Sequence, residues 1–175
     1  MNRRFGFLSA AVLLGASTVA CASDGFGSVR CGADIPKALI GQTTSDERVV
    51  VIEKRHKDLG LKDLGGSEVS DRLFLASWRI CGDEYALLEE KNAIRDAIKV
   101  PAHSRDAPEF VGACRAGGKD ESATIIAVLK NETGAATLPA TAAWKIDEKT
   151  MKFIQLGTDG LRCPRDGVIT ADGGR

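Results

Sequence analysis

The sequence contains few of the residues that large ligand-binding faces require. Aromatic residues make up 5% of the chain, which argues against a broad aromatic platform for carbohydrate. No segment concentrates basic residues, because the most basic stretch, residues 54–57, is flanked by Glu53 and Asp58. Nucleic acid and anionic membrane surfaces both require a dense positive face, so neither is an expected partner.

The sequence also lacks the spacings of metal, redox and phosphate sites. It has two histidines, His56 and His103, and no CxxC pair, whereas a zinc site needs three or four protein donors. The acidic residues near Gly65-Gly66 do not follow the spacing of a calcium loop. Neither this glycine pair nor Gly117-Gly118 belongs to a phosphate-binding loop. We therefore expect no metal and no cofactor.

The sequence contains no run of roughly 20 apolar residues, as a transmembrane anchor requires. Instead, two arginines precede a shorter apolar stretch that ends in Ala20-Cys21-Ala22. This pattern predicts a signal peptide over residues 1–22, cleaved near Ala22, and a periplasmic or extracellular protein. The alternative is a lipid anchor on Cys21, which is disfavoured because Thr18 occupies the position of the usual large aliphatic residue.

Four cysteines follow the leader, and an even number in an exported chain predicts two disulfides. They are Cys31, Cys81, Cys114 and Cys163. Three pairings satisfy four cysteines. We favour the pairing in which Cys31 joins Cys163 and ties the two ends together, with Cys81 bonded to Cys114.

The mature chain has the length of one ordinary domain. Residues 23–33 are rich in Gly and Ser and are expected to be loose. Residues 34–163 are expected to form a single disulfide-stabilised globular domain. The polar, Gly-rich residues 164–175 are expected to form a flexible tail.

Short β-rich segments recur along this domain. Asp34 and Pro36 predict a short helix that ends at Gly41. The valine run of residues 48–55 predicts a strand, and residues 57–65 predict two successive turns. Further strands are expected at 73–81, 85–89, 94–100, 109–114, 123–129, 140–146 and 152–156, with Gly82-Asp83 as the first hairpin turn.

These segments predict a mainly β fold: a compact antiparallel barrel or sandwich with one short N-terminal helix. The alternative is an α+β fold, which requires residues 59–73 to be helical. Alternation along the first strand of the hairpin places Trp78 on the same face as Ile80, where we expect it to pack in the core.

The loop between Pro101 and Pro108 is the predicted binding surface, because function concentrates on loops held by a stiff scaffold. It carries His103, Arg105 and Asp106. We expect an exported, non-enzymatic binding or inhibitor-like module with a protein or cell-wall glycan partner. On this hypothesis, replacing His103 and Arg105 with Ala abolishes binding and leaves the melting temperature nearly unchanged.

Two alternatives stay open. One is a small secreted hydrolase that uses His56 and His103, with Asp58 or Asp106 as the orienting carboxylate and Ser104 as a nearby hydroxyl. It requires both histidines in one cleft, because a general base must lie within hydrogen-bond reach of its proton. The other is a structural envelope component with no discrete ligand.

Overall fold

The computed structural model describes residues 24–120 and 123–169. The predicted signal peptide, the alternative lipid anchor on Cys21 and residues 170–175 of the predicted tail lie outside the described residues. No helix among the described residues is long and apolar enough to cross a membrane.

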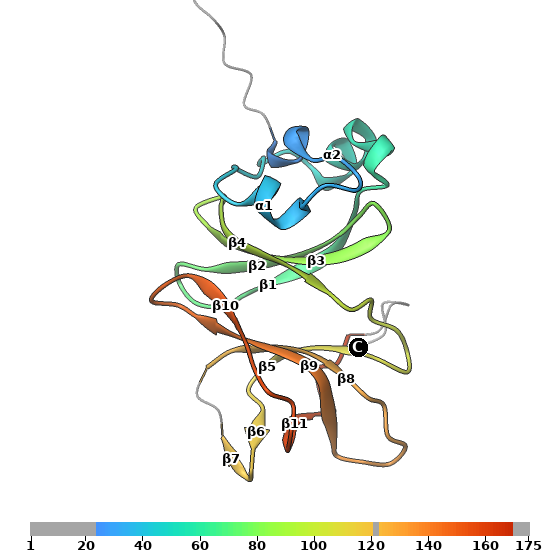
Figure 1. Cartoon of the computed structure of the whole chain (residues 1–175), viewed down its shortest axis with the longest axis vertical. Helices are drawn as coiled ribbons and strands as arrows, with labels where there is room; N and C mark the ends of the chain where they lie inside the picture. The colour runs from blue at the N-terminus through green and yellow to red at the C-terminus, as the bar shows by residue number, and fades with distance from the viewer. Residues whose placement is uncertain (1–23, 121–122, 170–175) are drawn as a thin grey trace, which may run out of the picture.

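The described chain contains short helical segments followed by two antiparallel sheets (Figure 1). The helical segments are η1 (Gly25–Ser28), α1 (Ile35–Leu39), α2 (Val49–Arg55) and η2 (Lys57–Leu59). The first sheet has the order β1-β2-β3-β4, formed by β1 (Lys62–Glu68), β2 (Phe74–Ile80), β3 (Asp83–Glu90) and β4 (Ala93–Val100).

The second sheet follows the order β5-β8-β9-β11-β6-β7, and β10 pairs with β9 beside this path. Its strands are β5 (Glu109–Gly112), β6 (Arg115–Ala116), β7 (Lys119–Asp120), β8 (Ile125–Leu129), β9 (Thr137–Asp147), β10 (Lys152–Gln155) and β11 (Leu161–Pro164). The mainly β prediction is confirmed. The arrangement is sandwich-like and does not close into a barrel. The α+β alternative is wrong, because β1 occupies the middle of the segment that it required to be helical.

The molecule is layered: the helical segments cover one face of the first sheet, and the second sheet packs on the other (Figure 1). Side chains alternate between these faces along each strand. Trp78 and Leu87 point toward the helices and belong to the same apolar cluster as Phe26. Leu75 and Leu88 point toward the second sheet and pack with Ile126. The prediction that Trp78 packs in the core is confirmed.

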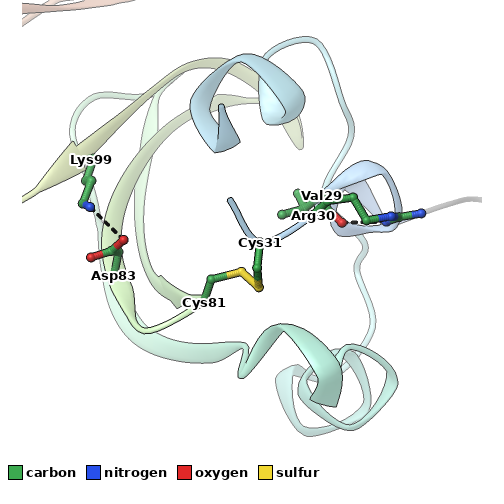
Figure 2. The surroundings of a disulfide bond; sticks show 6 residues. All are labelled: Val29, Arg30, Cys31, Cys81, Asp83 and Lys99. Atoms are coloured by element: carbon green, nitrogen blue, oxygen red, sulfur yellow. Dashed lines mark hydrogen bonds and ion pairs between the residues drawn. A yellow bond between two sulfur atoms is a disulfide. The ribbon is translucent and has the colours of Figure 1, made fainter. Parts of the chain in front are cut away.

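Both disulfides close loops within one half of the chain. Cys31 is bonded to Cys81, and Cys114 to Cys163, so the predicted pairing is wrong. Each half of the chain builds its own sheet, which keeps Cys31 and Cys163 apart. The first bond ties the segment after η1 to the β2–β3 turn (Figure 2).

The valine run forms α2, so the predicted strand is wrong. Ile52 packs into the core beneath the helix. Lys54 and Arg55 occupy the last turn, where cations interact favourably with the helix dipole. Tertiary contacts therefore override the strand preference of β-branched residues.

Two segments at the ends of the described chain differ from the prediction. Residues 24–33, expected to be loose, form η1 and bury Phe26 and Val29 completely. Cys163 lies in β11, and Ile169 pairs with Glu109 in an isolated bridge. Residues 164–169 are therefore held by the second sheet rather than free.

Candidate functional site

A groove of about 420 Å³ opens between the helical layer and the β1–β2 side of the first sheet. On this face of the sheet α1 packs chiefly against β4, and α2 lies against β1. Its floor is apolar and includes Phe26, Ile52 and Trp78. Val49 of α2 and Phe74 of β2 also line it, and both are exposed.

Phe74 lies between two carboxyl groups across three neighbouring strands. Its register partner on β1 is Glu68, and its partner on β3 is Glu89. Directly paired residues on an antiparallel sheet have their Cβ atoms about 5 Å apart and point to the same face. All three residues line the groove. Phe74 is 41% exposed there, although apolar residues are packed in a core on each face of its sheet.

Gly66 provides the space for the Phe74 ring. A Cβ atom built on Gly66 would lie 2.6 Å from the ring and 2.5 Å from the carbonyl oxygen of Leu75. The second contact is with backbone, which cannot move aside as a side chain can. Glycine in a strand often marks such a close approach, and here it fixes where the ring lies.

Glu89 is a buried carboxyl group with one hydrogen bond. Its exposed fraction is 9%, and its Oε2 accepts a hydrogen bond of 3.1 Å from the Thr44 hydroxyl. Burial raises the pKa of Glu89, and the Thr44 hydrogen bond only partly opposes this effect. No fully buried side-chain oxygen or nitrogen in the described residues lacks a partner. The Oε1 atom, which has none, is therefore still open to solvent on the groove side.

The rim of the groove is predominantly acidic. Five acidic residues line it against two basic ones, Arg72 and Lys91. Arg72 is already bound to Glu90 at 2.5 Å. Within the described residues, the carboxylates of Glu68 and Asp71 have no hydrogen bond or ion pair. The free charge around the groove is therefore mainly negative.

The outer edge of β1 is partly closed by side chains. Glu53 of α2 accepts a hydrogen bond of 2.9 Å from the Asp63 backbone N–H, and the Asp63 carboxylate accepts one of 3.0 Å from Gly65. Proteins protect sheet edges in this way against pairing with another chain. This edge of β1 is therefore less available for pairing with a strand of another chain.

A buried polar cluster lies between the two sheets. His103, from the loop that connects them, is 7% exposed. Its Nδ1 lies 2.6 Å from a carboxylate oxygen of Glu84 on β3 and 3.7 Å from one of Glu109 on β5. Its backbone N–H donates to Glu84 over 2.9 Å. The cluster thus ties the connecting loop to both sheets.

The pKa values of the two carboxyl groups in this cluster shift in opposite directions. Burial raises the pKa of Glu84, but hydrogen bonds from Arg79 and from His103 outweigh it and leave this pKa below its usual value. Burial also raises the pKa of Glu109, and here it outweighs the lowering effect of His103. The nearby Glu84 raises this pKa further, and Ser77 lowers it least. The Ser77 hydroxyl and Glu109 line a second hollow of about 260 Å³ at the mouth between the sheets.

The predicted loop surface is only partly exposed. Arg105 and Asp106 are exposed, but their backbone carbonyls accept hydrogen bonds from the Asn131 side chain and backbone. His103 is buried between Glu84 and Glu109, so its assignment to the surface is wrong. Ser104 accepts a hydrogen bond from the Ala107 backbone N–H within the loop.

The two histidines have separate partners. His56 follows α2, and its Nε2 lies 2.5 Å from Asp24, which also binds Arg55. His103 has Glu84 and Glu109, so neither predicted carboxylate, Asp58 or Asp106, orients a histidine among the described residues. No cluster of three potential metal ligands occurs in the part of the chain that the structure describes.

Sequence analysis did not identify Phe74, Glu68 or Glu89. The available signal was the hairpin itself, because its register decides which residue lies opposite Phe74. Comparison with known proteins finds no matching family model, no matching curated protein and no matching solved structure.

Proposed function

We propose that this chain is an exported, non-enzymatic module that binds a partner protein through the groove and the adjoining face of α2. One observation carries this proposal: three consecutive valines of α2, a helix that borders the groove, are exposed. Val50 is 61% exposed, and Val49 and Val51 are each more than a third exposed. Val49 also lines the groove.

Valines at exposed positions of a helix lower the stability of the protein. β-branched residues are weak helix formers, and an exposed helix surface usually carries polar side chains. An exposed apolar surface next to a groove with a polar rim is typical of a protein-binding site. We call the three valines together with the groove the binding face.

Two features support export. The sequence begins with the pattern of a signal peptide, and the four cysteines that follow it form two disulfides. Structural disulfides persist in oxidising compartments such as the periplasm and the exterior of the cell. The buried His103 cluster supports a non-enzymatic role, because hydrogen bonds from His103 to Glu84 and its ion pair with Glu109 tie two sheets together.

Photo-crosslinking tests the proposal in cells that export the protein. A benzophenone amino acid replaces Val50 in one variant and Lys149, exposed on the turn after β9, in a control. We expect a discrete protein adduct from position 50 that position 149 does not give. Equal adducts from both positions, or none from position 50, would contradict the proposal.

A further inference from the structure

The arrangement of Glu68, Phe74 and Glu89 indicates what the groove binds. We propose that it receives the side chain of a lysine or arginine from the partner protein, with the cationic head over the Phe74 ring and between the two carboxyl groups. This inference rests on the proposed function, since it names the group by which the partner is recognised.

The exposed Phe74 ring is the first feature of the groove that favours a cation. A cation above an aromatic face within about 6 Å of its centre is attracted to the ring, and the attraction grows when water is excluded. Phe74 has no aromatic or cationic partner among the described residues. The ring lies close to the backbone of Gly66, and Phe74 lines the groove with 41% of its surface exposed.

The free hydrogen-bonding capacity of Glu89 is the second feature that favours a cation. This side chain is nine-tenths buried, and Thr44 occupies one oxygen while the other has no partner. A lysine ammonium or an arginine guanidinium supplies several donors and no acceptor. Such a group would satisfy Oε1 and stabilise the ionised carboxylate in a place that otherwise disfavours it.

The shape and charge of the groove also favour a lysine or arginine side chain. Lysine and arginine have long apolar stems behind their charged heads, and the groove combines an apolar floor with an acidic rim. Glu68 and Asp71 carry negative charge with no partner among the described residues, so they attract a cation before it enters. An anionic group on a partner would meet charge of its own sign and be repelled.

The experiment is a titration followed by ¹⁵N–¹H NMR on the folded, disulfide-bonded protein. The probes are the peptide acetyl-Val-Lys-Val-amide, the same peptide with norleucine in place of lysine, and n-butylammonium. We expect the lysine peptide to shift the amide signals of Phe74, Glu89 and Thr44 in a saturable manner. The norleucine peptide and butylammonium should bind at least tenfold more weakly.

Two substitutions separate the groove from the rest of the surface. Glu89→Gln keeps the shape and removes the charge, and we expect it to weaken the lysine peptide at least tenfold. Glu148→Gln is the matched control, made on an exposed residue of the second sheet, and should leave binding unchanged. Unfolding curves of both variants show whether a loss of binding reflects a loss of structure.

Each contrary outcome has one meaning. Equal binding of the norleucine peptide would show a purely apolar site and overturn the proposal. Equal binding of butylammonium would indicate a small free amine rather than a protein side chain, which also overturns it. Failure of all three probes, while the adduct from position 50 still forms, would reject the cationic side chain but leave the proposed protein-binding function standing.

Discussion

Phe74 and Glu89 are paired across β2 and β3, so an exposed aromatic ring lies beside a buried carboxyl group on the same face of the sheet. Neither residue is notable by itself. Their pairing depends on the β2–β3 turn, and Gly66 of β1 leaves the space in which the Phe74 ring lies. Several measurable properties of the protein follow from this relationship and from the layers around it.

Gly66→Ala is expected to destabilise the protein by about 2 kcal/mol, because the new methyl group would overlap the Leu75 carbonyl and the Phe74 ring. Urea unfolding measures the change. Gly157→Ala is the control, because a Cβ at that position would meet no atom within 4 Å. A loss in the control as large as that in Gly66→Ala would refute the close approach as the cause.

Val50→Ala is expected to stabilise the protein by about 0.5 kcal/mol while weakening partner binding. The stabilisation follows from the higher helix propensity of alanine at an exposed position, and the weaker binding from the loss of exposed apolar surface. Thermal unfolding and partner binding are measured on the same samples. A destabilised variant would mean that Val50 supports the fold rather than the binding face.

His103→Ala is expected to lower stability by about 3 kcal/mol, because it leaves Glu84 and Glu109 facing one another without the imidazole. Because His103 is buried, we no longer expect the double substitution of His103 and Arg105 with Ala to leave the melting temperature nearly unchanged. Arg105→Ala alone, on an exposed residue, should change stability by less than about 0.5 kcal/mol. Similar losses from both single variants would argue against the buried cluster.

Removing the Cys31–Cys81 bond with serine at both positions is expected to cost about 4 kcal/mol in the chain-entropy model, given the sequence separation of 50. Peptide mapping without reduction identifies the pairing directly. A peptide that joins Cys31 to Cys163 would contradict the observed fold, in which the two cysteines belong to different layers.

Glu89 is expected to make stability depend on pH above about 4.5. Burial raises the pKa of Glu89 above the ordinary value of 4.5. A carboxyl group that holds its proton more tightly when folded stabilises the fold fully below its unfolded pKa. That contribution is lost as the pH rises through the folded pKa. Glu89→Gln should therefore gain stability relative to the original protein between pH 4.5 and pH 7.

Urea unfolding at several pH values measures this difference. Glu148→Gln, made at an exposed position, should give a stability curve parallel to that of the original protein. A Glu89→Gln curve that is also parallel would show that the Glu89 carboxyl titrates as in the unfolded chain.

The sequence predicted the β-rich elements well where local signals are strong. The helix at Asp34 is confirmed, with the Asp34 side chain accepting a hydrogen bond from the Lys37 backbone N–H. The turn at Lys91-Asn92 has a local signal of the same kind, because both residues have positive φ and asparagine tolerates that conformation. These features depend on a few neighbouring residues, so a single sequence contains the information.

The candidate site depends on register, which local signals do not fix. The sequence predicted a turn at Gly82-Asp83, whereas Cys81 and Gly82 form it. Moving the turn by one residue moves every cross-strand partner by two, which would place Lys91 opposite Phe74 instead of Glu89. The cationic-side-chain site would then vanish from the prediction.

The valine run and His103 show a second limit. The strand preference of Val49–Val51 is outweighed by the anchoring of Ile52 in the core and by the contacts of Arg55 with Asp24 and Glu47. His103 stands in a polar stretch of sequence, yet Glu84 and Glu109 bury it from two different sheets. Both outcomes depend on residues distant in the sequence.

The most direct test of the account is crosslinking from position 50 in cells, compared between the original groove and the Glu68→Gln, Glu89→Gln double variant. We expect a discrete protein adduct with the original groove and its loss in the double variant, at equal expression and with a melting temperature no lower than that of the original protein. An adduct of unchanged yield in the double variant would contradict the claim that this groove binds the partner.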